Sequence, residues 1–279
     1  MKTESVSISE HDKKKIAALR RTVWAFFRAN GRHDLPWRKN HDPYHVWISE
    51  IMLQQTQVPR VLEKYVQFME LFPTVQKLSK APLGDVLRAW QGLGYNRRAK
   101  MLHACAQEIV RMQNGVFPSN TSALRSLPGI GPYTASAIQA FAFNIGTPLI
   151  ETNVRTVFLH HFFPHRDSVH DNELMPLIEA VLPRGHARDW YAALMDYGTH
   201  LKVSVGNANH RSRHHIVQST FKGSDRELRG KILRILAQKN ATLRTLQKLD
   251  PSNNRTKTQL QKLHNEGMIK KEENYYTLG

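Results

Sequence analysis

The sequence predicts an all-α fold for most of the chain, followed by a small separate domain at the C-terminus. Apolar residues recur at helical spacing from the start, and along residues 14–29 they fall on one face of a helix. These residues are Ile16, Leu19, Val23, Phe26 and Phe27. Pro or Gly separates most of the apolar segments that follow, as expected at helix ends. No alternating apolar and polar run long enough for a strand occurs before about the last dozen residues.

The expected helices follow one another along the chain. Asp42-Pro43 favours a helix start, because aspartate caps a helix N-terminus well and proline fits its first position. Further helices are expected at residues 60–71, 83–91, 96–112, 121–126, 132–143, 152–162, 171–181 and 187–203. From about 204 to 219 the chain is polar and basic, which indicates an ordered loop or a linker that contacts the protein's partner. Its histidines lack accompanying cysteines, so we expect them to face solvent or phosphate rather than a metal.

Residues 223–279 form the expected small domain. An amphipathic helix at 227–238, a short helix at 242–249 and a third at 253–265 precede a hairpin with its turn at 272–274. Three short helices followed by a hairpin is the winged-helix arrangement, which presents its third helix to a DNA groove. Arg255 and Lys257 of that helix would then contact DNA. A generic helical appendage and a dimerisation module are the alternatives.

The charge of the chain favours a polyanionic partner. The chain has 279 residues and a formal net charge of +17, and its pI is about 10.1, which suits binding through phosphate neutralisation. An anionic membrane suits the same charge, but we find no transmembrane-length apolar run, signal peptide or lipidation motif. The single cysteine, Cys105, excludes an internal disulfide and a cysteine-rich metal centre. We therefore expect a cytoplasmic nucleic-acid-binding protein, associated with the nucleoid if it is bacterial.

Residues 127–131, Leu-Pro-Gly-Ile-Gly, form the most informative segment. Its glycines allow a sharp backbone turn and the close approach of another molecule. The helix expected from about Pro132 would begin with outward-facing amides, and such an N-terminus is a natural phosphate site. The segment therefore indicates a hairpin that binds the DNA backbone.

Two carboxylates are candidates for acid chemistry. On a helix from Pro43, Glu50 shares a face with apolar side chains. Poor solvation there would raise its pKa and suit a general acid at neutral pH. The alternative is a glutamate near a helix N-terminus that merely complements the helix dipole. Glu151 follows an apolar stretch and precedes a helix, so it has the same alternative.

Two carboxylates on one sugar carbon would share the work of cleaving a glycosidic bond. One protonates the leaving group, and the other supports the cationic sugar or attacks it. Cleavage between base and deoxyribose poses the same problem, once the base is taken out of the stack. Gln54, Gln55 and Thr56 follow shortly after Glu50 and would fill or read the vacated space.

Several motifs in one order resemble the helix-hairpin-helix DNA glycosylase superfamily, and within it the MutY-type adenine DNA glycosylases. The resemblance spans about residues 35–203. The matching segments are Leu35-Pro-Trp-Arg, Asp42-Pro-Tyr-His-Val-Trp, Ser49-Glu-Ile-Met-Leu-Gln-Gln-Thr-Gln-Val, Trp90-Gln-Gly-Leu-Gly-Tyr, Leu127-Pro-Gly-Ile-Gly-Pro-Tyr-Thr-Ala and Glu151-Thr-Asn-Val.

The resemblance implies a two-lobed fold. Residues 1–40 and 151–220 would form one helical lobe, 41–150 a six-helix lobe with the hairpin, and 223–279 the winged-helix-like domain. It implies a monomer that acts on duplex DNA containing a mismatch or lesion.

The resemblance also assigns roles in the reaction. Glu50 matches the acid that protonates adenine, Glu151 the carboxylate that stabilises the oxocarbenium ion, and Asn153 an active-site amide. Tyr133 stands where relatives that also nick the strand have a Schiff-base lysine. A phenol cannot form that imine, so a glycosylase without AP-lyase activity is expected.

The DNA contacts implied by the resemblance form two groups. Gln55 and Tyr95 would wedge into the duplex, with Thr56 and Leu93 near the base opposite the target. The remaining DNA-contacting residues are Arg38, Gln54, Gly94, Gly129, Ile130 and Gly131.

The chain departs from the family in three ways. The family's four cysteines for an iron–sulfur cluster are absent after Tyr197–Val205, so no cluster and no other cofactor is expected. Glu151 replaces the family's aspartate, and a carboxylate displaced by about 1 Å can lower a rate on the order of a hundredfold. The family's Nudix-like C-terminal domain, which checks for 8-oxoguanine, is not recognisable.

Three functions follow as hypotheses. The first is removal of adenine opposite 8-oxoguanine or guanine in base excision repair. The second is a mismatch glycosylase for thymine, uracil or another damaged base, which Glu151 and the altered C-terminus favour. The third is a DNA-binding protein that kept the fold and lost catalysis. Both carboxylates should line one pocket beside the hairpin if the first is correct.

Overall fold

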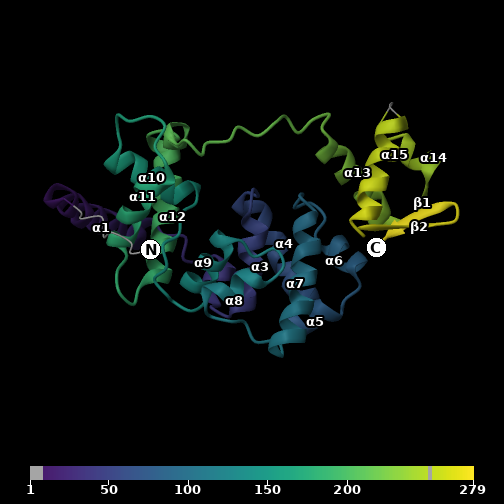
Figure 1. The fold of residues 1–279 in the computed structure, drawn as a ribbon, viewed down its shortest axis with the longest axis horizontal. Coiled ribbons are helices and arrows are strands. Elements are labelled where there is room, and N and C mark those ends of the chain that lie inside the picture. Colours follow the sequence, from purple (N-terminus) through teal and green to yellow (C-terminus); the bar gives the residue numbers. More distant parts are fainter. Residues whose placement is uncertain (1–8, 251–252) are drawn as a thin grey trace. The chain divides into compact units, whose positions relative to one another are not determined.

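The computed structural model describes residues 9–250 and 253–279, and this part of the chain is mainly helical (Figure 1). It divides into two compact units. The first contains the described residues up to Trp47, together with Ser119–Arg125 and Ile130–Val217. The second contains Ile48–Pro118, Ser126–Gly129 and Gln218–Gly279.

The first unit is built around the helix α12. Its elements are α1 (Glu10–Asn30), α2 (Pro36–Lys39), the start of α3 (Pro43–Leu53), most of α8 (Thr121–Ser126), α9 (Pro132–Phe141), α10 (Thr152–Phe162), α11 (Asp171–Val181), α12 (Ala187–Ser204) and the 3-10 helix η1 (Ala208–Arg211). α12 packs against α1, α9 and α10. The core between them is large and apolar, with Val23, Phe158 and Trp190 fully buried.

The second unit combines a helical layer with the C-terminal residues. Its elements are the end of α3, α4 (Val58–Leu71), α5 (Val75–Lys80), α6 (Leu83–Ala89), α7 (Arg97–Gln113), α13 (Asp225–Gln238), β1 (Ala241–Thr242), α14 (Leu243–Gln247), α15 (Asn253–Asn265), β2 (Ile269–Glu272) and β3 (Tyr275–Leu278). α7 packs against α5 and α6, and α6 also contacts α13 and β3. Lys100 donates a hydrogen bond to the Glu266 carbonyl, which further ties α7 to the C-terminal residues.

The boundaries of these units differ from those of the expected lobes, and residues 41–47, 119–125 and 218–220 are among those that lie in another unit than expected. Residues 130–150 were expected in the 41–150 lobe, but they belong to the first unit because α9 packs on α12 and buries Ala137 and Ala140 in that core. Residues 223–279 were expected as a separate domain, but the contacts of α6 place them in the second unit.

The C-terminal part confirms the three helices and the hairpin, and it adds a strand. The antiparallel sheet has the order β1-β3-β2, with Ala241 paired to Tyr276 and Ile269 to Leu278. Gly267 ends α15 at a φ of +66°, and the Met268 amide then donates to the Leu263 carbonyl at 2.9 Å. This closure leads the chain directly into β2.

The helix boundaries agree with expectation where a cap or proline marks them. α1 begins four residues before the expected start, because Ser9 Oγ accepts from the Asp12 amide at 3.1 Å and caps it. α2 and α5 were missed, since four and six residues are too few to show helical periodicity. Among the described residues, no helix combines the length and apolar character needed to cross a membrane.

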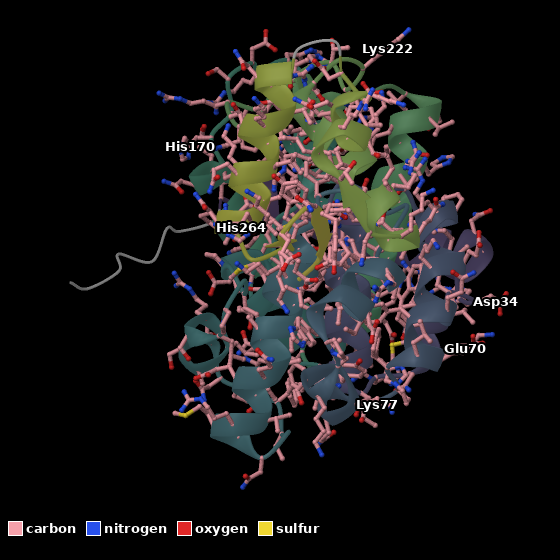
Figure 2. The ribbon with its side chains drawn as sticks, turned by 90° about the vertical axis from the view of Figure 1, so that its right-hand side faces the viewer. Asp34, Glu70, Lys77, His170, Lys222 and His264 are labelled. Carbon is pink, nitrogen blue, oxygen red and sulfur yellow. The ribbon has the colours of Figure 1, made fainter. Side chains whose placement is uncertain are left out.

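Charged side chains cover the exposed faces of both units. Figure 2 shows Asp34, Glu70, Lys77 and Lys222 extending away from the ribbon. Each helix thus turns its polar face to solvent and its apolar face to the core.

Candidate active site

Glu50 is a buried carboxylate near the C-terminal end of α3. Its residue is only 6% exposed, and Ser49 and Met52 beside it are 1% and 0% exposed. The helix ends at Leu53, so Glu50 lies in its last turn. The alternative of a carboxylate that complements the dipole at a helix N-terminus is therefore wrong, because the dipole opposes negative charge at this end.

Arg98 of α7 holds the end of α3. Its guanidinium donates to the carbonyl oxygens of Ile51, Met52 and Gln54 at 2.7, 3.0 and 2.6 Å. These contacts satisfy carbonyl groups at and just beyond the C-terminal end of the helix. Burial lowers the pKa of Arg98 to about 10, so the group stays charged at neutral pH.

The same guanidinium reaches the turn before α7. It donates to the carbonyl oxygens of Leu93 and Gly94 at 3.0 and 3.1 Å. It also donates to Thr56 Oγ1 at 3.1 Å. Arg98 therefore joins the turn at 54–56 to the turn at 93–95, and six of the residues predicted to contact DNA lie together in the second unit.

Gln55 and Tyr95 occupy the strained positions of these two turns. Their φ angles are +54° and +46°, in the left-handed region that non-glycine residues rarely adopt. Gln55 is exposed and Tyr95 is 37% exposed. Strained, exposed side chains of this kind are typical of functional sites.

The C-terminal segment reaches the same two residues. Gln218 Nε2 donates to Gln55 Oε1 at 3.0 Å, and the Tyr95 hydroxyl donates to Gln218 Oε1 at 3.3 Å. Arg226 Nη1 donates to the Tyr95 hydroxyl at 2.7 Å. Sequence reasoning missed Gln218 and Arg226, because no local pattern marks contacts across 123 and 131 positions.

Glycine suits the two hairpin positions for different reasons. Gly129 has a φ of +76°, and an added Cβ would lie 2.9 Å from Met101 Cβ, so the fold itself requires glycine. Gly131 caps α9 at a φ of −85°, and an added Cβ would meet nothing within 4 Å. Its small size thus leaves open space at a helix start that has no side-chain cap. Ile130 is 5% exposed, so it anchors the hairpin and offers only its backbone.

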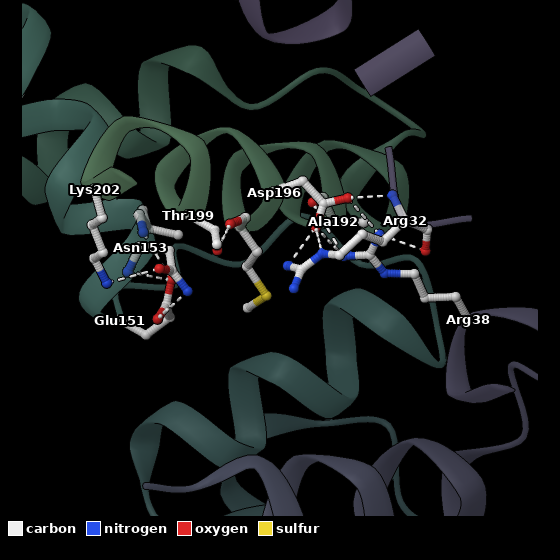
Figure 3. Close-up of polar contacts among 10 residues, drawn as sticks. Arg32, Arg38, Glu151, Asn153, Ala192, Asp196, Thr199 and Lys202 are labelled. Atoms are coloured by element: carbon white, nitrogen blue, oxygen red, sulfur yellow. Dashed lines mark hydrogen bonds and ion pairs between the residues drawn. The ribbon is translucent and has the colours of Figure 1, made fainter. Parts of the chain in front are cut away.

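Glu151 is the N-cap of α10. Its Oε1 accepts from the Asn153 and Val154 amides at 2.7 and 2.8 Å, and its Oε2 accepts from Thr152 Oγ1 at 3.1 Å (Figure 3). The helix-start role is therefore confirmed. The helix-start role is compatible with a catalytic role, because capping holds the carboxylate in a single orientation.

Asn153 and two residues that the sequence did not indicate complete this end of α10. Asn153 Nδ2 donates to Glu151 Oε2 at 3.3 Å, and Asn153 Oδ1 accepts from Lys202 Nζ at 2.8 Å. A Cβ on Gly198 would lie 2.4 Å from the Asn153 carbonyl oxygen, so only glycine lets α12 approach α10 here. Gly198 and Lys202 are four residues apart on α12 and therefore share one face of that helix. The sequence did not indicate their role, because it does not show that this face packs against α10.

The two acids lie in different units, Glu50 in the second and Glu151 in the first. Their convergence on one sugar stays a prediction. Tyr133 lies in the first turn of α9, half-buried against the core of the first unit.

Two of the residues predicted to contact DNA also form ion pairs within the protein. Arg38 donates to both carboxylate oxygens of Asp196, at 2.7 and 2.9 Å, and its side chain is 16% exposed. Arg255 donates to Asp225 and Asp250 at 2.9 and 2.7 Å. The Arg38 pair is largely buried, whereas the Arg255 side chain is 30% exposed and pairs at the surface. The DNA contacts of both residues stay predictions. Lys257 is exposed on α15.

The chain does not offer the ligands of an iron–sulfur cluster. Cys105, its one cysteine, is fully buried in α7, and burial raises the pKa of its thiol. Four thiolates therefore cannot be supplied, and in residues 9–250 and 253–279 no three His, Cys, Asp or Glu side chains are grouped to hold a metal ion. The segment after α12 is instead held by Asn209 Nδ2, which donates to the Thr152 carbonyl at 2.8 Å and to Thr156 Oγ1 at 2.6 Å.

Comparisons with known proteins agree with this geometry. The signature of the HhH-GPD superfamily of base excision DNA repair proteins matches residues 48–183. The adenine DNA glycosylase of Mycolicibacterium smegmatis is 34% identical over 224 residues, which cover 74% of this chain and 76% of that protein. That of Buchnera aphidicola subsp. Baizongia pistaciae is 36% identical over 178 residues, covering 63% and 51%.

Among solved structures, a thermostable thymine-DNA glycosylase is similar with a TM-score of 0.60 and 28% identity. The match covers 67% of this chain and 87% of that chain. The chain spans about half the length of the Buchnera relatives that it matches.

Proposed function

The chain belongs to the HhH-GPD superfamily of base excision DNA repair proteins, in its MutY-type group, and on this premise we propose that it releases adenine from mispaired duplex DNA. The observation that carries the proposal is Glu50, a carboxyl that is 6% exposed in the last turn of its helix. Its helix leads into the strained turn at Gln55, which Arg98 fixes to the turn at Tyr95. An acid placed beside side chains suited to enter a duplex fits a base that is first extruded and then protonated.

The proposed reaction uses the two acids in sequence. Glu50 donates its proton to a ring nitrogen of the extruded adenine, and the bond from that base to the sugar C1′ breaks with its electron pair leaving on the base. Glu151 stabilises the positive charge that develops on the sugar. Water then adds to C1′, and the deprotonated Glu50 accepts the proton that this water loses.

We further propose that the enzyme does not cut the strand and works without a cluster. Tyr133 supports the first point, because a phenol cannot form an imine with the abasic sugar. The single buried thiol supports the second. The proposed partner is duplex DNA with a mismatch or lesion, bound by a monomer.

A base-release screen tests the function. Duplexes would pair adenine, thymine, uracil or hypoxanthine with guanine, cytosine or 8-oxoguanine, and strand cleavage would be scored with and without alkali. We expect release of adenine opposite 8-oxoguanine or guanine, with cleavage only after alkali. Preferred release of thymine or uracil would replace adenine as the substrate, and binding without any release would show a non-catalytic protein. Cleavage without alkali would contradict the role given to Tyr133.

The winged-helix-like part is proposed as a second DNA contact. The outer face of α15 carries Lys257, Gln261 and Lys262, all exposed, and Lys270 and Lys271 are exposed on β2. A polar, basic helix face beside a basic strand suits contacts to phosphate.

Replacing both Lys257 and Lys262 by alanine should weaken duplex binding and reduce its salt dependence. The slope of log K against log salt is negative, and each lost phosphate contact reduces its magnitude by about 0.9. The magnitude of the slope should therefore fall by about 1 to 2 in the double variant. Fluorescence anisotropy over a salt series measures this slope. The matched control is Lys77→Ala with Lys80→Ala on α5, which removes the same charge from exposed sites of the same unit. Equal slopes for the two double variants would refute the DNA contact of α15.

A further inference from the structure

Lys202 contacts the candidate catalytic residues from the neighbouring helix. Its Nζ donates to Asn153 Oδ1 at 2.8 Å, and Figure 3 shows Lys202, Asn153 and Glu151 grouped at the start of α10. The side chain is half-buried, and burial lowers the pKa of Lys202 while the charge of Glu151 opposes that change. No role was predicted for this residue, and the proposed reaction does not use it.

The chemistry of an ammonium group fixes the orientation of the Asn153 amide. A lysine has three donors and no acceptor, so it can contact Asn153 only through Oδ1. The other end of the amide, Nδ2, must then point away from Lys202, and it donates to Glu151 Oε2 at 3.3 Å. Without the lysine, the two amide orientations would be similar in shape, and one of them would turn an oxygen toward the carboxylate.

The surroundings leave this arrangement little freedom. α12 touches the α10 backbone at Gly198, one turn before Lys202, where no side chain fits. On another side, Asn209 binds the Thr152 carbonyl and Thr156 Oγ1. Because the first turn of α10 is held from two directions, the contact of Lys202 acts on the amide and not on the position of the helix.

We propose that Lys202 is a positioning residue for base excision, which holds the Asn153 amide so that it donates to Glu151. The proposal rests on the proposed function, in which Glu151 stabilises the cationic sugar. The amide N–H holds Oε2 in place, while Oε1 is held by two backbone amides. Lys202 thus fixes the orientation of the Glu151 carboxylate through the amide.

The test uses the full-length chain with Lys202→Met and the conservative Lys202→Arg. The single-turnover rate of base release from the best wild-type duplex should fall about tenfold to a hundredfold in Lys202→Met, as expected for a misplaced group. Affinity for duplex should stay near that of the wild type. Lys202→Arg should restore most of the rate, because a guanidinium also has N–H donors and no acceptor for Asn153 Oδ1.

A double-mutant cycle with Asn153→Ala separates positioning from other effects. In the Asn153→Ala background, Lys202→Met should have little further effect, because both changes remove the same contact. An unchanged rate in Lys202→Met would overturn the proposal, and so would a full additional loss in the Asn153→Ala background. Thermal unfolding identifies a variant that fails to fold, and the rate of a folded Lys202→Arg then decides, because a rate as low as that of Asn153→Ala would overturn the proposal. A wild-type protein that releases no base from any duplex refutes the proposed function before the variants are compared.

Discussion

Replacing Glu50 by glutamine should lower the rate of base release by about a hundredfold to ten-thousandfold, the usual contribution of a general acid or base. Glutamine has nearly the same shape but carries no acidic proton, so the adenine would leave unprotonated. Since Glu50 is 6% exposed, bulk water has little access to replace the donor. Duplex affinity should be largely retained, because the residues predicted to enter the DNA lie after Glu50 and are not altered.

Single-turnover base release and duplex binding, measured on the same preparation, separate these outcomes. Glu70→Gln is the matched control, since Glu70 is an exposed glutamate of the same unit that points away from the ribbon in Figure 2. It should keep the wild-type rate. A wild-type rate in Glu50→Gln would eliminate Glu50 as the acid, and equal thermal unfolding of the two variants excludes misfolding as the cause of a loss.

The fold was predictable wherever local chemistry marks a boundary. The expected helices at 121–126, 152–162, 171–181 and 253–265 match α8, α10, α11 and α15 at both ends. Caps set two of these starts, Glu151 for α10 and His170 for α11. The strand β1 has only two residues, and it exists because β3 pairs with it in the register of Thr242 with Tyr275, 33 positions away.

The site was predictable in part. The burial of Glu50 followed from the spacing of apolar residues on its helix, since Val46 and Trp47 are 2% and 1% exposed. The position of Glu50 near the end of that helix could not be predicted, because no glycine or proline marks the end of the helix at Leu53. Arg98 and Lys202 could not be identified, since their roles depend on carbonyl and amide groups brought near by packing.

Arg38 forms an ion pair that its sequence context does not indicate. An arginine in a motif shared with DNA-binding relatives looks like a phosphate contact, yet it pairs with Asp196, 158 positions away. The acid on α12 shows no sequence signal of its own, because a single aspartate in an amphipathic helix usually faces solvent. Only the helix packing reveals that its side chain is 2% exposed.

Replacing Asp196 by alanine should lower the free energy of unfolding of the first unit by about 3 to 5 kcal/mol, as when one partner of a buried ion pair is removed. Asp196 accepts from the Arg32 amide at 2.8 Å, from Arg32 Nε at 2.6 Å and from both Nη atoms of Arg38. Its loss leaves Arg38 charged and poorly solvated. Urea unfolding followed by tryptophan fluorescence measures the change. This signal reports mainly on the first unit, which contains Trp24, Trp37, Trp47 and Trp190.

The matched control is Asp34→Ala, which removes an aspartate that pairs with Lys39 at 3.2 Å while fully exposed (Figure 2). An exposed pair contributes at most about 1 kcal/mol.

Burial alone would raise the pKa of Asp196, but the hydrogen bonds and charges of Arg38 and Arg32 hold it below the usual value. The stabilisation is therefore present above the pKa of an unfolded aspartate and is lost as the pH falls through the lowered folded value. The difference between wild type and Asp196→Ala should shrink over that range, and a difference no larger than that of Asp34→Ala at neutral pH would show that the pair is not a major support of the first unit.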